Sequence, residues 1–184
     1  MKLVTIDDCG VDRYLPDNNL LPGGITANFT RQARLCFDDT DQIDIISLIG
    51  TDHPESDVAF NAVNIPGIGC HTNRFEGKTP VQYIEVLDNR EKNFTRYEQG
   101  VLEHFYIDEK QKQILANADL IMTPVYWQIH NVFDAVFASE LGGIVAVDFS
   151  DFSTNPEFEL LSKYIDKIEI AFFGLSSSQT DLID

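Results

Sequence analysis

Polar side chains suited to binding a hydroxyl-rich ligand lie within the first 28 residues. Asp12 follows a short apolar run, and Asn28 comes four residues after the glycine pair Gly23-Gly24. The Asn28 amide both donates and accepts hydrogen bonds, so it suits a sugar hydroxyl, whereas Asp12 taken singly is also explained as a helix cap or turn former. Two glycines at the start of a helix let a ligand approach the backbone and its N–H donors. An ordinary tight turn also explains the glycines, and both readings stay open here.

Other candidates follow runs that are predicted to be parallel strands, because ligands bind beyond the carboxyl ends of such strands. They are Asp7, Asp8, Gly50, Asp52, Tyr126, Trp127, Asp148 and Asp151. Taken singly, each acid is also explained as a helix cap or turn former, Asp52 most readily. Trp127 suits stacking on a sugar face, and it equally suits packing within the protein.

No residue pattern indicates a metal site or a disulfide. The four histidines lack metal-ligand spacing, and Cys9, Cys36 and Cys70 form no C-x-x-C pair. Scattered cysteines of this kind indicate reduced thiols. The sequence also has no signal-peptide core and no apolar run of membrane-spanning length, so we expect a cytoplasmic protein.

The composition describes an acidic globular protein. The 184 residues include 13 Lys and Arg against 30 Asp and Glu, a net charge of −17, and 43% are hydrophobic. This length suits one domain. The acidity argues against nucleic acid or an anionic membrane as a partner, since both require a basic surface.

Hydrophobic periodicity predicts an alternating α/β fold with a mostly parallel sheet. Strands are expected at 3–6, 44–49, 119–125, 144–149 and 169–173, and helices at 25–36, 58–63, 108–115, 129–137 and 156–164. Gly142-Gly143 is expected to close the fourth helix. Residues 9–22 are interpreted as a loop with a short exposed strand at Tyr14-Leu15.

Two further segments complete the expected organisation. Residues 79–87 alternate apolar and polar side chains and return at 93–97, which predicts an antiparallel hairpin. Ser176 to Ser178 resemble a helix N-cap at the start of another βα unit. We therefore expect the C-terminal part of the fold to be missing from this chain.

The order of these features resembles the ribokinase-like (phosphofructokinase-B type) carbohydrate kinases. The resemblance is carried by Asp12, Pro22-Gly23-Gly24-x-x-x-Asn28, Ala33-Arg34-Leu35, Ile49-Gly50-Thr51-Asp52 and the hairpin. Within that family the chain looks most like the fructosamine (fructoselysine) 6-kinases, through Asp88-Asn89-Arg90, Tyr97-x-x-Gly100-Val101-Leu102 and Asp148-Phe149-Ser150-Asp151.

The resemblance implies a three-layer, Rossmann-like α/β architecture with a small β lid. Residues 1–184 would form the N-terminal portion of a single kinase domain, with lid segments near 10–21 and 79–98. Asp12, Gly23, Gly24 and Asn28 would bind the sugar, whereas Arg96 and Tyr97 would face the substrate or a partner lid. Two copies of the chain would pair through their lids as a homodimer.

The implied activity is ATP-dependent phosphorylation of a hydroxyl on a sugar or sugar-amine such as fructoselysine, with Mg²⁺. Ser178 and Asp181 stand where the family has its cofactor-linked Asn-x-x-Glu element, and Glu55 replaces the second glycine of Gly-x-Asp-x-x-Gly. No Gly-Ala-Gly-Asp motif occurs, so the catalytic base is expected beyond the chain end. The alternatives are a non-catalytic remnant that binds a sugar or a partner, and an unrelated α/β enzyme.

Overall fold

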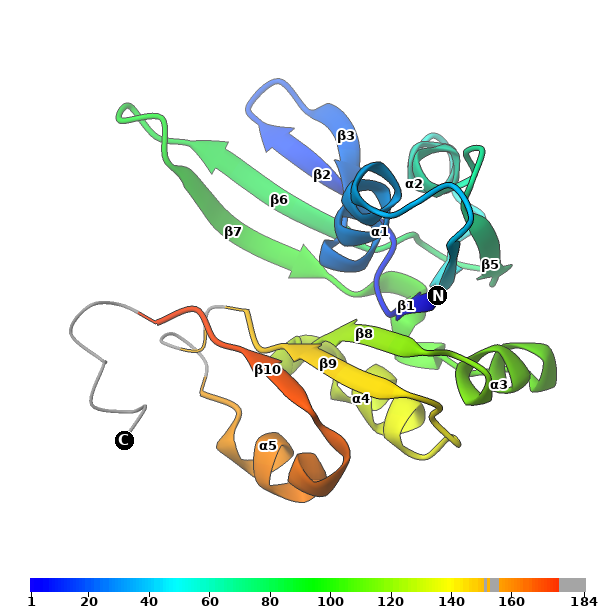
Figure 1. Ribbon diagram of the computed structural model, residues 1–184. Coiled ribbons are helices and arrows are strands. Elements are labelled where there is room, and N and C mark those ends of the chain that lie inside the picture. Colours follow the sequence, from blue (N-terminus) through cyan, green and yellow to red (C-terminus); the bar gives the residue numbers. More distant parts are fainter. Residues whose placement is uncertain (151, 153–155, 176–184) are drawn as a thin grey trace.

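A six-stranded parallel sheet forms the centre of the computed structural model, which describes residues 1–150, 152 and 156–175 (Figure 1). The strand order is β10-β9-β8-β1-β4-β5, and each neighbouring pair is parallel. The strands are β1 (Lys2–Ile6), β4 (Gln42–Ile49), β5 (Gly69–Arg74), β8 (Leu120–Pro124), β9 (Ile144–Asp148) and β10 (Ile170–Phe172). The predicted α/β class is confirmed.

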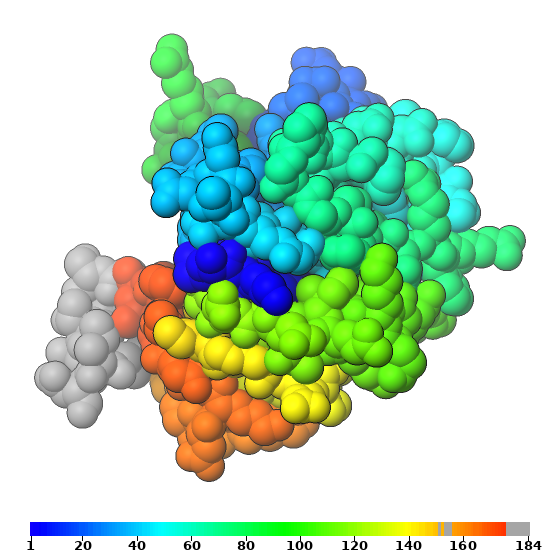
Figure 2. Space-filling model, turned by 45° about the vertical axis from the view of Figure 1, so that its right-hand side comes forward, coloured from blue at the N-terminus to red at the C-terminus, as the bar shows by residue number. Residues whose placement is uncertain are grey.

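Helices cover both faces of this sheet and make three layers (Figure 1). One layer holds α1 (Ile25–Cys36) and α2 (Glu55–Val63), and the other holds α3 (Glu109–Ala116), α4 (His130–Phe137) and α5 (Phe158–Tyr164). The nearly continuous apolar run of β4 is buried from Ile43 to Ile49, as expected for a strand covered on both sides. Figure 2 shows the N-terminal residues, in dark blue, at the surface between the light-blue segment and the green and yellow segments of the chain.

The hydrophobic core has two parts, one on each face of the central sheet. Val4 and Ile6 of β1 pack in the same cluster as Phe133 and Phe137 of α4, whereas Leu3 packs on the α1 side. Successive side chains of a strand point to opposite faces, so one strand contributes to both halves of the core. These contacts place the carboxyl ends of β1, β8 and β9 side by side. The side of the sheet on which these strands end is called its carboxyl edge.

A smaller mixed sheet, the lid sheet, projects from that edge. Its order is β3 (Asn19–Gly23), β2 (Gly10–Leu15), β6 (Val81–Val86) and β7 (Lys92–Glu98). The predicted hairpin is confirmed as β6 and β7. The interpretation of 9–22 as mainly loop is wrong, because β2 pairs in parallel with the distant β6 as well as with β3.

Local sequence signals explain the start of α3 but not the buried face of α1. Asp108 and Gln111, whose spacing is typical of a capping box, form one at the start of α3. The apolar spacing of Ile25, Phe29, Ala33 and Cys36 predicts the helix 25–36, but α1 buries Thr26, Ala27, Thr30 and Ala33 and leaves Phe29 and Cys36 exposed. The Thr30 and Thr5 hydroxyls lie 2.6 Å apart and seat this polar face on β1.

Two details near the other strands differ from expectation. Helix α4 ends at Phe137, well before Gly142-Gly143, which instead precede β9. Gly143 has a φ of 62°, and a Cβ there would lie 2.2 Å from the Asp119 carbonyl oxygen. Strand β5 carries few apolar residues and was not predicted. Among the described helices, none combines the length and apolar character needed to cross a bilayer.

Candidate functional site

A cleft with two lobes lies between the lid sheet and the carboxyl edge of the central sheet. The first lobe, about 440 Å³, is bordered by Asp8, Asp12, Gly24, Asn28 and Lys92. The second lobe, about 570 Å³, is bordered by Trp127, Gln128 and Glu157 among others. The lobes share Gln82, Phe94, Tyr97, Tyr126 and Ser150, so they form one continuous cleft.

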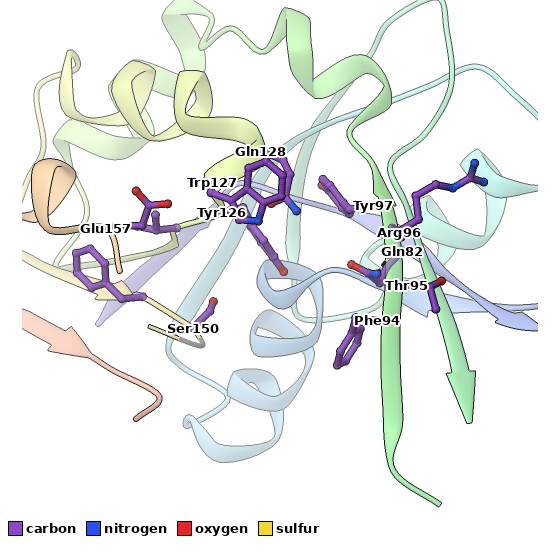
Figure 3. A pocket seen from close by; sticks show the side chains of 12 residues that line it. Gln82, Phe94, Thr95, Arg96, Tyr97, Tyr126, Trp127, Gln128, Ser150 and Glu157 are labelled. Atoms are coloured by element: carbon purple, nitrogen blue, oxygen red, sulfur yellow. Dashed lines mark hydrogen bonds between the residues drawn. The ribbon is translucent and has the colours of Figure 1, made fainter. Parts of the chain in front are cut away.

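The rings of Tyr97 and Tyr126 form the waist between the lobes (Figure 3). Tyr97 comes from β7 of the lid sheet and Tyr126 from the segment after β8, and their ring centroids lie 5.8 Å apart with planes 3° from parallel. Burial raises the pKa of both phenols well above the ordinary value, which keeps them protonated near neutral pH. Both phenols therefore retain a hydrogen to donate.

Asp12 presents its carboxylate to the first lobe from β2. Burial raises its pKa, while the Lys92 ammonium nearby acts in the opposite direction. Gly23 pairs next to this strand, and a Cβ at Gly23 would lie 2.3 Å from Asp12 Oδ1. Gly23 does not border either lobe; it leaves the space that the Asp12 side chain occupies.

Gly24 and Asn28 border the first lobe from the start of α1. Gly24 is the helix N-cap with a φ of 93°, a conformation that glycine adopts readily. The expected N–H donors are partly used within the protein, because Asp8 Oδ1 accepts the Thr26 N–H at 3.2 Å. Burial raises the pKa of Asp8 to about 6. Asp8 thus serves as a helix cap and also borders the cleft.

Arg96 and Tyr97 are adjacent in β7 but point in different directions. Tyr97 faces the cleft, whereas the Arg96 guanidinium lies 4.0 Å from the centroid of the Tyr83 ring and 3.0 Å from Glu98 (Figure 3). Consecutive strand residues point to opposite faces of a sheet. Both residues border the second lobe, and only Tyr97 also borders the first. Ser178 and Asp181 lie outside the described residues.

The sequence interpretation missed the lid residues that complete the first lobe. Gln82 sits opposite Tyr97 in the β6–β7 register, and Lys92 and Phe94 lie farther along β7. A register shift in the β6–β7 pairing, next to Tyr83 and Ile84, sets which β7 side chains face the cleft. The alternating pattern of the hairpin identified the strands without revealing this shift.

Some of the acids noted in the sequence have structural roles. Asp52 Oδ1 accepts hydrogen bonds from the backbone N–H and the hydroxyl of Thr79, at 2.9 and 2.6 Å. Asp148 accepts the Ser150 N–H at 2.8 Å. Asp148 therefore acts as a turn former, whereas Asp52 ties its loop to Thr79, which is 27 residues away in sequence.

Three buried polar atoms along the cleft lack a hydrogen-bond partner among the described residues. They are Tyr97 Oη, Ser150 Oγ and Gln128 Oε1. Ser150 also has a φ of 51°, an uncommon conformation for a residue with a side chain. Buried polar groups in proteins are normally paired, so these atoms point to contacts with a bound polar ligand.

Comparison with solved structures decides the type of fold. The chain matches ribokinase from Giardia lamblia with a TM-score of 0.74 over 94% of this chain and 57% of that one, at 14% sequence identity. A putative ribokinase II from E. coli, solved with ATP and Mg²⁺, matches with a TM-score of 0.67 over 100% and 64% of the two chains, at 15% identity.

The fold is ribokinase-like.

Two curated proteins are also similar to this chain in sequence. Fructosamine kinase FrlD of Bacillus subtilis is 25% identical over 178 residues, and fructoselysine 6-kinase of Escherichia coli is 28% identical over 168 residues. The alignments cover 95% and 89% of this chain but only 59% and 60% of those proteins. No protein-family model matches the chain. The predicted resemblance to ribokinase-like carbohydrate kinases of the fructoselysine type is confirmed.

The described part of this ribokinase-like chain does not fit ATP or Mg²⁺. Lys92 faces Asp12, and Arg96 is held by Glu98 and Tyr83, so neither forms a phosphate-binding cluster. Within the described residues there is also no group of three or more His, Cys, Asp or Glu that could hold a metal ion.

Proposed function

We propose that this chain provides the sugar-binding cleft of an ATP-dependent kinase that phosphorylates a hydroxyl group of a sugar-amine related to fructoselysine. The first lobe carries the proposal. It brings Asp12 and Asn28 together with Gln82 and Lys92, from four separate elements, around a volume of about 440 Å³. The fructosamine and fructoselysine kinases it resembles support the substrate class.

The residues of this lobe suit the recognition of sugar hydroxyls. The Asp12 carboxylate accepts hydrogen bonds, the Lys92 ammonium donates them, and the amides of Asn28 and Gln82 do both. Gln82 Nε2 also donates to the backbone oxygen of Arg96 at 3.0 Å, which fixes the amide against β7. The lid sheet lies over the lobe and would exclude water from a bound sugar.

ATP with Mg²⁺ is the phosphoryl donor implied by the relatives, and it would supply the group that is transferred. The residues described here bind and orient the acceptor sugar and keep water away from it. We assign them no part in binding the nucleotide.

Titration calorimetry with fructoselysine tests the proposal. We expect saturable binding to the unmodified chain, and Asp12→Asn should weaken it about tenfold through loss of a charged hydrogen bond. Asp17→Asn removes an exposed acid from the β2–β3 turn and should leave the affinity unchanged. Equal affinity in the Asp12→Asn variant would remove Asp12 from the site, and no sugar binding to the unmodified chain would refute the proposal.

Adding MgATP to the same titration tests the non-catalytic alternative. The described residues form no phosphate-binding cluster and the sequence has no Gly-Ala-Gly-Asp motif, so on this chain alone MgATP should neither bind to the sugar complex nor turn over. Turnover to a phosphorylated sugar in a coupled assay would contradict this expectation and would exclude the non-catalytic alternative. We also propose that two chains pair through their lid sheets.

A further inference from the structure

The second lobe differs in chemistry from the first. Its wall includes exposed aromatic rings, with Trp127 56% and Phe94 63% exposed, beside the waist tyrosine Tyr126 (Figure 3). Its polar side chains include Glu157 and Gln128, and the Gln128 Oε1 atom is buried and without a partner among the described residues. The lobe therefore combines flat aromatic surfaces with hydrogen-bond acceptors.

The charges around this lobe favour a cation. Arg96 is the one Lys or Arg among the described residues that border it, and its guanidinium is held 3.0 Å from Glu98 and 4.0 Å from the centroid of the Tyr83 ring. Glu157 supplies a carboxylate, of which Oε1 lies 3.1 Å from His130 Nε2. Phosphate recognition requires donors aimed at the ligand. A carboxylate beside aromatic faces instead suits an ammonium group.

The two lobes are continuous through the waist, where Tyr97 Oη and Ser150 Oγ have no described partner. If the sugar ring of a ligand lies in the first lobe, the group attached to that ring would lie in the second lobe. We infer that the second lobe binds the amino-acid portion of a sugar-amine through its ammonium groups, with Glu157 and Trp127 as its specificity-determining residues. This inference rests on the proposed function and names the part of the substrate that sets specificity.

Calorimetric titrations with fructoselysine, fructosylglycine and fructose test the inference on the whole chain. Fructoselysine should bind at least about tenfold more tightly than fructose, with fructosylglycine between them because it lacks the long cationic arm. Glu157→Gln should weaken fructoselysine binding about tenfold and leave fructose binding unchanged. Trp127→Ala should weaken it about fivefold through loss of a cation–π contact.

Matched controls separate this effect from general changes in charge or surface. Glu159→Gln removes an exposed acid from α5, the helix whose N-cap residue is Glu157, outside the lobe, and Leu35→Ala shortens an exposed apolar side chain on α1. Both should bind all three ligands as the unmodified chain does. Circular dichroism melting curves confirm that each variant is folded.

The outcomes distinguish failure of the inference from failure of the proposed function. If fructose and fructoselysine bind equally and Glu157→Gln changes neither, the inference is wrong while sugar binding stands. If Glu157→Gln strengthens MgATP binding and leaves fructoselysine binding unchanged, the lobe takes phosphate and the inference is wrong. If the unmodified chain binds none of the sugars, the proposed function fails and the inference fails with it.

Discussion

Tyr97 and Tyr126 stack across the cleft with ring centroids 5.8 Å apart and planes 3° from parallel. One ring belongs to β7 of the lid sheet and the other to the segment that follows β8 of the central sheet, so their contact links the lid sheet to the carboxyl end of β8. The stack also divides the cleft at the point where a buried hydroxyl, Tyr97 Oη, lacks a described partner. The Tyr97–Tyr126 pair therefore contributes both to the position of the lid sheet and to the binding of a ligand.

Replacing Tyr97 by Phe should separate these two roles. The ring and its stacking remain, and no hydrogen bond within the described structure is lost, so the free energy of unfolding should stay within about 1 kcal/mol. The affinity for fructoselysine should fall about fivefold, because the hydroxyl contact with the ligand is lost. Urea titration and calorimetry measure the two quantities, and an unchanged affinity would mean that Oη does not contact the sugar-amine.

Asp8 should make the stability depend on pH. Burial raises its folded-state pKa from 3.8 to about 6, so between about pH 4 and pH 6 the folded chain binds more protons than the unfolded chain. The free energy of unfolding should therefore decrease as pH rises through 6, by about 3 kcal/mol from this group.

Asp8→Asn is the matching variant, because asparagine still caps α1 and does not titrate. Its unfolding free energy, measured by urea titration at several pH values, should fall less steeply between pH 4 and pH 7. Asp17→Asn, at an exposed position, should follow the unmodified curve. Parallel curves for the Asp8→Asn and unmodified chains would contradict the prediction.

Gly23→Ala should weaken sugar binding by displacing Asp12, although Gly23 itself does not border the cleft. The new Cβ would lie 2.3 Å from Asp12 Oδ1 and 2.8 Å from the Asp12 backbone nitrogen, so strand and side chain must shift. We expect a loss of about 1–3 kcal/mol in stability and a weakening of sugar binding similar to that of Asp12→Asn. Calorimetry on folded protein checks the second effect, and normal affinity in the Gly23→Ala variant would show that Asp12 has other space available.

Thr79→Val should loosen the base of the lid sheet. The Thr79 hydroxyl donates to Asp52 Oδ1 at 2.6 Å and accepts the Gly50 N–H at 3.2 Å, and the residue is fully buried. Leaving these groups unpaired should cost about 1–3 kcal/mol of unfolding free energy. Thr79→Ser keeps the hydroxyl and should recover most of the stability in the same urea titration; equal losses in both variants would assign the effect to packing.

Pairing through the lid sheet should depend on its exposed apolar residues. Val86, Leu87 and Phe94 are 54%, 44% and 63% exposed near the outer end of β6 and β7. A dimer formed by lid contact should shift to monomer on Val86→Asp, as measured by sedimentation velocity. Leu35→Asp, on the exposed surface of α1, serves as the control. A sedimentation coefficient that responds to neither change, or equally to both, would exclude this mode of pairing.

The sequence by itself determined the order of the central elements. The apolar runs of β1, β4, β8 and β9, the apolar stripe of α4 and the capping box of α3 are local signals, because a strand or helix shows its period within a few residues. Asp12, Gly24 and Asn28 were also identified from residue type and spacing, and they do lie together at the first lobe.

Only the tertiary structure decided how distant segments meet. Strand β2 is held by β6, about 70 residues away in sequence, so its own short pattern looked like a loop. The roles of Gly23 and Arg96 depended on a neighbouring strand and on a register shift in β7. The Tyr97–Tyr126 stack and the second lobe join residues of the lid sheet to residues of the segments that follow β8 and β9. Such contacts are set by sheet register and packing, which no local period encodes.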